Sequence, residues 1–290
     1  AEEEILFDCN KEAEGFEYFK MTGLSVSPDN KLIAFGVDTL SRRKYTIRIK
    51  NLETGEIYPE EIETTTGGST WAADNKTLFY TKKDEETLRS DRVYRHTLGT
   101  PSDTDVEVFK EEDDTFNTFV YKTKSDKYIV IGSVSTLTSE YRFLHADEPT
   151  KEFKIFQERI RGMEYGIAHY DDHFYILTNV DGATNFKLMK TPDNATAIEH
   201  WVDLIPHRED TLLEDVDIFK DYLVVSERNN GLNRINIKRG DGTEDYYLPF
   251  DNEAYTAYVS TNPEFDTDIL RYSYNSLTTP NSVIDFDMKT

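Results

Sequence analysis

The stretch STWAADNKTLFYTKKD, residues 69–84, decides the fold of this chain. A short segment leads through a polar turn near Asp74 into TLFYTKK (77–83), which is rich in β-branched and aromatic residues. Turn residues bound this run on both sides, as they do around strands. The stretch therefore predicts a β-hairpin. No part of the chain shows the apolar spacing typical of a helix over a full helix length.

Five further stretches share this order of short strand, polar turn and second strand. They are GLSVSPDNKLIAFGVD (23–38), YKTKSDKYIVIGSV (121–134), GIAHYDDHFYILTN (166–179), DVDIFKDYLVVSER (215–228) and VSTNPEFDTDILRYSY (259–274). The six turns lie near Asp29, Asp74, Asp126, Asp172, Asp221 and Asp266, at steps of 45, 52, 46, 49 and 45 residues. A third strand follows each hairpin, and most units add a fourth, such as 105–111, 152–158 or 245–250.

A four-stranded unit that recurs every ~40 to 50 residues is typical of a β-propeller. One such blade cannot cover both faces of its own sheet, so neighbouring blades must stack. No linker and no change of composition interrupts the series. The sequence therefore predicts an all-β fold in which residues 1–290 form a single β-propeller domain.

The first residues suggest that the chain begins inside a blade. Ile5–Asp8 (ILFD) reads as one outermost strand of an incomplete seventh blade, ahead of six visible repeats. The alternative is a complete six-bladed ring in which this strand closes the last blade. The last unit slightly favours that alternative, because the sequence stops at Thr290 before a fourth strand.

Composition excludes several classes of protein. The chain has 33 basic and 56 acidic residues, a net charge of −23, yet 13% of its residues are aromatic, so it is acidic and folded. The charge disfavours nucleic acid and favours basic peptides. The single cysteine, Cys9, allows no internal disulfide and fits a reducing compartment. With no apolar run of about 18 residues and no signal peptide, we expect a cytoplasmic protein without a membrane partner.

The residues carry no convincing catalytic or metal site. Gly67-Gly68-Ser69 is the nearest match to a nucleophile elbow, but it lacks the later glycine and leads into a strand. His169 and His173 flank a hairpin turn, so they should lie on different strands and hold no metal. We therefore expect no catalytic residue, no metal and no cofactor.

Other polar residues have structural interpretations. His96 is expected to be a hydrogen-bonded blade residue. Paired acids such as Glu111-Glu112, Asp113-Asp114 and Asp171-Asp172 could resemble glycosidase carboxylates, but most lie in turns and no sialidase box is present. Solvated turn acids are the preferred interpretation.

A co-linear series of segments resembles a known family. The segments are 6–30, 38–56, 71–100, 137–147, 163–179, 185–189, 205–210, 223–232 and 262–283. In this order they resemble the propeller of the oligopeptidase B group in the prolyl oligopeptidase family of serine peptidases. The resemblance covers nearly all 290 residues.

The resemblance implies a seven-bladed propeller inserted in an α/β-hydrolase domain. The missing catalytic domain of the same polypeptide would be the partner, and it would follow Thr290. Family members cleave short peptides after arginine or lysine, so short basic peptides would be the substrates and the propeller would exclude folded proteins. This chain lacks the Ser-Asp-His triad and should be inactive alone.

The resemblance also singles out candidate interdomain residues. Glu17, in EGFEYF, matches a glutamate that bridges to an arginine of the catalytic domain when the two domains close. Glu14 competes for the same alignment. Arg42 and Arg43 are candidates for a domain contact, although a solvated loop is an equal alternative.

A stand-alone propeller that binds proteins or peptides is the alternative function. Such a propeller would close its ring by pairing Ile5–Asp8 with the last blade. A polysaccharide-active propeller is disfavoured, because neither sialidase boxes nor channel-directed acid pairs are evident.

Overall fold

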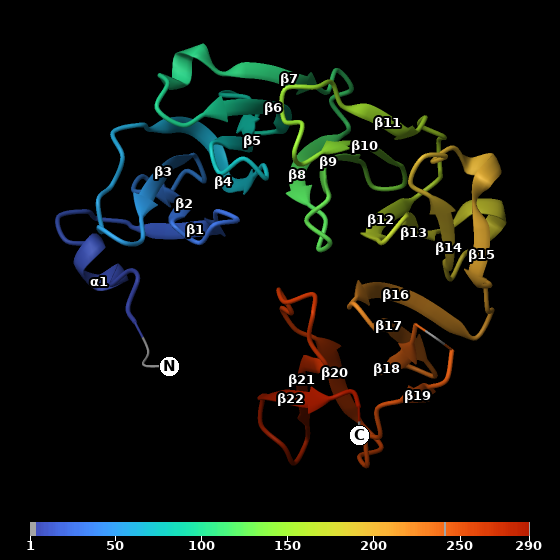
Figure 1. The fold of residues 1–290 in the computed structure, drawn as a ribbon. Coiled ribbons are helices and arrows are strands. Elements are labelled where there is room, and N and C mark those ends of the chain that lie inside the picture. The colour runs from blue at the N-terminus through green and yellow to red at the C-terminus, as the bar shows by residue number, and fades with distance from the viewer. Residues whose placement is uncertain (1–3, 241, 290) are drawn as a thin grey trace. The chain divides into compact units, whose positions relative to one another are not determined.

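A computed structural model describes residues 4–240 and 242–289 (Figure 1). The chain divides into two compact units. The first holds residues 1–122, 126–136 and 140–156, and the second holds 123–125, 137–139 and 157–290. The described part is nearly all β, as expected, with 22 strands beside the four-residue helix α1 (Cys9–Glu12). Three 3₁₀ turns are η1 (Ser102–Thr104), η2 (Val180–Gly182) and η3 (Ile198–His200), and no described helix has the length and apolar character needed to span a membrane.

The strands of the first unit form two antiparallel sheets. The larger sheet runs in the order β1 (Lys20–Val26), β2 (Leu32–Asp38), β3 (Tyr45–Asn51), β4 (Ile62–Trp71), β5 (Thr77–Lys83), β6 (Ser90–Thr97) and β7 (Val106–Lys110). The smaller sheet consists of β8 (Asn117–Lys122), β9 (Tyr128–Val134), β10 (Ser139–His145) and β11 (Lys154–Gln157).

Three sheets make up most of the second unit. The first contains β12 (Tyr165–Tyr170), β13 (His173–Thr178), β14 (Lys187–Pro192) and β15 (Val202–Ile205). The next contains β16 (Thr211–Ile218), β17 (Tyr222–Asn229), β18 (Leu232–Arg239) and β19 (Asp245–Tyr247). The last contains only β20 (Tyr255–Val259), β21 (Ile269–Ser276) and β22 (Ser282–Asp287).

Strand β4 belongs to two blades at once. Its first half pairs with β3, through Ile47 opposite Ile62, and its second half pairs with β5, through Trp71 opposite Leu78. The register with β5 shifts between Thr65 and Ser69, which marks a bulge. The first two blades are therefore joined through one continuous strand.

Glycines make this crossing possible. A Cβ atom on Gly36 would lie 2.5 Å from the Cα of Gly67, and one on Gly23 would lie 2.0 Å from the carbonyl oxygen of Gly67. Gly67 itself has a φ of 90°, which favours glycine. The glycines before Ser69 thus serve a close approach of three strands.

The aspartate of the first turn forms hydrogen bonds within that turn. Asp29 accepts hydrogen bonds from the hydroxyl of Ser27 at 2.7 Å and from the backbone N–H of Lys31 at 3.1 Å. The bond from Ser27 is the main cause that holds the pKa of Asp29 below its usual value. Such local bonds stabilise a turn against extended chain.

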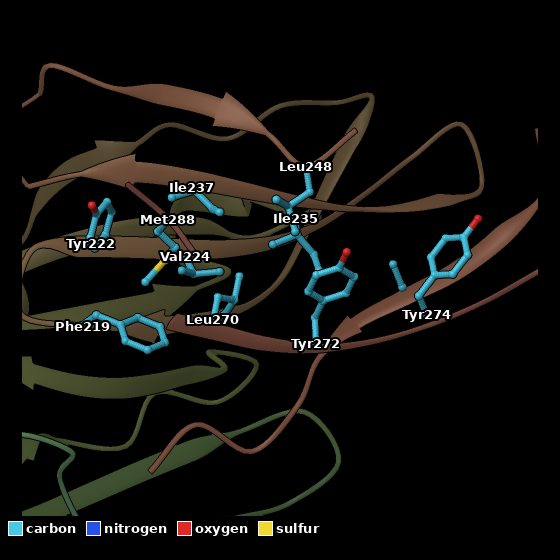
Figure 2. Packing of buried hydrophobic residues seen from close by; sticks show 11 residues of the cluster. Phe219, Tyr222, Val224, Ile235, Ile237, Leu248, Leu270, Tyr272, Tyr274 and Met288 are labelled. Carbon is cyan, nitrogen blue, oxygen red and sulfur yellow. The ribbon is translucent and has the colours of Figure 1, made fainter. Parts of the chain in front are cut away.

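Buried apolar clusters fill the space between consecutive blades within each unit. In the first unit, Ile47 and Ile49 of β3 pack in one cluster with Trp71 and Leu78. Figure 2 shows the corresponding cluster of the second unit. Its members include Phe219, Tyr222, Val224, Ile235, Ile237, Leu248, Leu270, Tyr272, Tyr274 and Met288. Stacking of this kind is what blades with two apolar faces require.

The prediction of an N-terminal strand at Ile5–Asp8 is wrong. Ile5–Asp8 lies in no strand, because the carboxylate of Asp8 accepts the N–H groups of Asn10 and Lys11 and caps helix α1. The ring of Phe7 instead packs 4.7 Å from that of Phe35. Ile5–Asp8 therefore cannot close a ring as a strand of the last blade, because these residues form no strand.

Candidate functional site

The candidate interdomain residues leave the first blade at the same end. Lys20 at the start of β1 pairs with Asp38 at the end of β2. The segment that carries Glu17 precedes β1, and the loop that carries Arg42 and Arg43 follows β2. The structure therefore brings these residues to the edge of blade one at which the second strand ends. We call the corresponding edge of any blade its loop end.

Glu17 and Glu14 are both exposed at the loop end. Neither carboxylate forms an ion pair with any residue in the part of the chain that the structure describes. The backbone N–H of Glu14 donates to the carbonyl of Lys11, which fixes the main chain only. Beside Glu17, the side chain of Phe16 is 53% exposed. The exposed carboxylate of Glu17 and the exposed ring of Phe16 are thus neighbours in the chain at this edge.

A buried aspartate shapes the loop that carries Arg42 and Arg43. Asp38 accepts the backbone N–H groups of Leu40 at 2.9 Å and of Arg43 at 2.7 Å. The ammonium of Lys83 donates to the carbonyl of Arg43 at 2.6 Å, and burial followed by the nearby Arg43 charge lowers the pKa of Lys83. Both arginines are exposed, so the loop is built to present them.

Sequence reasoning missed a leucine that recurs in this loop in several blades, the first included. Leucine between hydroxyl-bearing or charged residues follows the second strand in Thr39-Leu40-Ser41, Thr87-Leu88-Arg89, Thr136-Leu137-Thr138 and Ser276-Leu277-Thr278. All four leucines are exposed, from 38% for Leu88 to 96% for Leu277. The repeated hydroxyl–leucine pattern was the signal that could have revealed them. We call this set the loop leucines.

A hollow also opens at the loop end of the β12–β13 blade. It has a volume of about 320 Å³ and is lined by Ile160, Arg161, Met163, Asn179, Val180 and Thr184, among others. Ile160 is itself partly exposed. The second unit therefore offers, at the same topological edge, a partly apolar depression whose lining includes one arginine and one aspartate, Asp181.

No catalytic set is formed by the residues that the sequence singled out. The hydroxyl of Ser69 is buried at the glycine crossing and makes no hydrogen bond within residues 4–240 and 242–289. His169 and His173 lie on β12 and β13, as expected. The Nδ1 atom of His169 is 2.8 Å from the hydroxyl of Ser125, and its Nε2 atom is 3.8 Å from Asp193. This resembles a triad, but the imidazole is fully buried and closed to substrate.

His96 and one of the paired acids are structural. His96 Nδ1 lies 2.7 Å from a carboxylate oxygen of Asp105, which also accepts the hydroxyl of Tyr80 at 2.9 Å. Burial, with the adjacent carboxylate, raises the pKa of Tyr80 well above its usual value. Glu111, expected to be solvated, is instead buried and accepts the hydroxyl of Ser133 and the N–H of Asp113. These two hydrogen bonds stabilise the buried carboxylate of Glu111 and hold the connection into β8.

Comparison with known proteins gives a consistent result. A family model described as prolyl oligopeptidase, N-terminal beta-propeller domain, matches residues 1–290. Dipeptidyl aminopeptidase BI of Pseudoxanthomonas mexicana is 42% identical over 290 residues, which are 100% of this chain and 40% of that protein. Protease 2 of Moraxella lacunata is 32% identical over 292 residues, covering 100% of this chain and 41% of that protein.

A solved structure agrees with these matches. Oligopeptidase B from Leishmania major is similar with a TM-score of 0.92 and 30% identity, over 99% of this chain and 42% of that one. The chain thus spans about two fifths of the length of the relatives it matches.

Proposed function

Because the chain belongs to the prolyl oligopeptidase family, as its N-terminal β-propeller domain, we propose that it gates an oligopeptidase B-like serine endopeptidase. The family model confirms the resemblance and the β-propeller class expected from the sequence. In this proposal residues 1–290 are a single domain of a cytoplasmic enzyme. An α/β-hydrolase domain of the same polypeptide covers the loop end and supplies the triad. Short peptides are cleaved after arginine or lysine, while folded proteins are excluded.

The observation that carries the proposal is the set of exposed groups at the loop end. Covering one leucine side chain contributes about 1.5–3 kcal/mol, so recurrent loop leucines favour a partner surface. Glu17 and Phe16 add a charge and an aromatic anchor at the same edge of the first blade. The relatives are more than twice as long as the chain, which supports a partner in the same polypeptide.

Charge supports the choice of substrate. A net charge of −23 attracts peptides that carry arginine or lysine and repels acidic ones. The attraction between exposed charges is screened by salt over about 10 Å at 0.1 M. We expect kcat/KM for basic peptides to fall as salt concentration rises, with a smaller change for neutral peptides.

Exchange of Glu17 tests the gating role in the complete polypeptide. If Glu17 bridges to the catalytic domain, Glu17→Gln should lower kcat/KM for a blocked arginyl substrate about tenfold, which corresponds to about 1.4 kcal/mol. Glu14→Gln tests the rival candidate and should retain full activity if the bridge belongs to Glu17. Unchanged activity of Glu17→Gln, or an equal loss in both variants, would reject the bridge. The 290-residue chain alone should hydrolyse nothing.

A second candidate activity follows from one relative. The 42% identical protein is named a dipeptidyl aminopeptidase, which favours release of dipeptides from a free amino terminus. Fluorogenic substrates with blocked and free amino termini separate the two activities in the complete polypeptide. Cleavage of the blocked arginyl substrate supports the endopeptidase, whereas cleavage confined to free dipeptide substrates supports the aminopeptidase. No cleavage of either would favour a binding scaffold.

A further inference from the structure

A second cavity of the second unit is lined by residues of β12, β13, β14 and β16, strands that Figure 1 labels. Its volume is about 130 Å³, and its walls are mostly apolar. The lining residues are Gly166, Ile167, Ala168, Tyr175, Leu177, Leu188, Asp215 and Val216. One acid among apolar walls is an arrangement typical of a small ligand site.

Small residues on β12 create the hollow. A Cβ atom built on Gly166 would meet no atom within 4 Å, so the space beside this glycine is open. Ala168, two residues further on, contributes only a methyl group to the wall. Larger side chains from Leu177 and Leu188 bound the other sides. The cavity therefore depends on residue size at two positions of one strand.

Among the residues that the structure describes, Asp215 is the only charged one that lines this cavity. It is exposed, so the cavity opens to solvent at its carboxylate. The carboxylate accepts the backbone N–H of Val216 at 2.8 Å and has no ion pair with any described residue. The register between β16 and β17 shifts between Leu213 and Asp215, and such bulges re-aim a side chain. Although Asp215 is exposed as a residue, its neighbours displace part of the water around the carboxylate, and this desolvation raises its pKa.

Asp217, the neighbouring acid on the same strand, differs from Asp215 because it has an ion-pair partner. Asp217 is paired with the ammonium of Lys124, at 2.8 Å, and this ammonium also lies 3.6 Å from the ring centroid of Phe219. The cation that neutralises the Asp217 carboxylate is therefore a side chain of the protein itself. Asp215 carries an uncompensated charge at the mouth of an apolar hollow.

We propose that this cavity binds the cationic side chain of a peptide, lysine or arginine, with Asp215 as its ion-pair partner. The aliphatic stem fills the space beside Gly166 and Ala168, and the charged head stays at the exposed carboxylate. The ring of Tyr175 in the wall gives the cation a second favourable surface. The proposal does not depend on peptidase activity.

Methyl NMR of the 290-residue chain tests this directly, because Ala168, Leu177 and Leu188 report on the walls. Titration with butylamine, or with lysine blocked at both ends, should shift these methyl signals saturably, whereas 1-butanol should not. Asp215→Asn should weaken binding at least tenfold. Asp103→Asn makes the same change of charge at an exposed residue of η1 and should leave the affinity unchanged.

Filling the cavity gives an independent check. Gly166→Leu retains the carboxylate and should abolish the saturable shifts, and Ala168→Val replaces it if that variant does not fold. Equal binding of butylamine and butanol would overturn the proposal, since the hollow would then bind apolar groups without regard to charge. A loss of less than twofold in Asp215→Asn would overturn it as well. Neither result would affect the outcome of the Glu17 exchange.

Discussion

The glycine crossing in the first unit makes a sharp prediction for Gly36→Ala. The new Cβ would lie 2.5 Å from the Cα and 2.6 Å from the carbonyl oxygen of Gly67. Carbon atoms attract only beyond about 3.5 Å, so the backbone must move by roughly 1 Å. Strand β2 is buried along its whole length, which leaves no room for that movement. Overpacking costs about 1–3 kcal/mol, and an obstruction made of backbone places this variant near about 3 kcal/mol.

The two tryptophans allow this loss to be assigned to the first unit. A Trp201→Phe background leaves Trp71, which is buried on β4 itself, as the sole indole reporter. Urea unfolding followed by its fluorescence should show a midpoint lower by about 1 M or more. Gly166→Ala in the same background is the matched control, because its Cβ would enter open space. If Gly36→Ala unfolds within about 0.5 kcal/mol of its parent, the close approach does not constrain β4.

Three further substitutions have defined outcomes. Asp105→Asn should lower the free energy of unfolding by about 2–4 kcal/mol, measured by urea unfolding, because the amide keeps one acceptor oxygen and turns an NH2 group toward either His96 or Tyr80 in place of the second carboxylate oxygen; an unchanged midpoint would contradict this. Asp215→Asn should raise the melting temperature at pH 7, since a raised pKa means that ionised Asp215 opposes folding; the gain should vanish below about pH 3, where the acid is protonated in both states. Leu277→Ser should leave the unfolding of the 290-residue chain unchanged but lower the melting temperature of the complete polypeptide; equal melting there would argue against a covered loop end.

The strands could be predicted where both faces of a sheet are buried. The expected strand 77–83 coincides with β5, and 128–134 coincides with β9, because five or more successive residues in each are buried. The aspartate turns could be predicted for a local reason, since Asp29 and Asp74 bond to the backbone two or three residues away. Short-range bonds and two-sided burial leave a pattern in the sequence.

Features that depend on distant partners could not be predicted. Nothing near Gly67 indicates that two other strands approach its backbone, and nothing near Gly166 indicates the empty space beside it. The loop end was predicted only through Glu17, Glu14 and the two arginines, by resemblance. The burial of Glu111 also depends on Ser133, 22 residues away.

Strand β4 has a consequence for the modularity of the domain. Repeat proteins are often shortened or extended by whole repeats, which requires a cut in a connection that no sheet shares. Here the link between the first two blades is itself a ten-residue strand, hydrogen-bonded on both sides. Deleting or transplanting the first blade would strip β5 of its inner neighbour. The smallest exchangeable piece at this end is therefore a pair of blades.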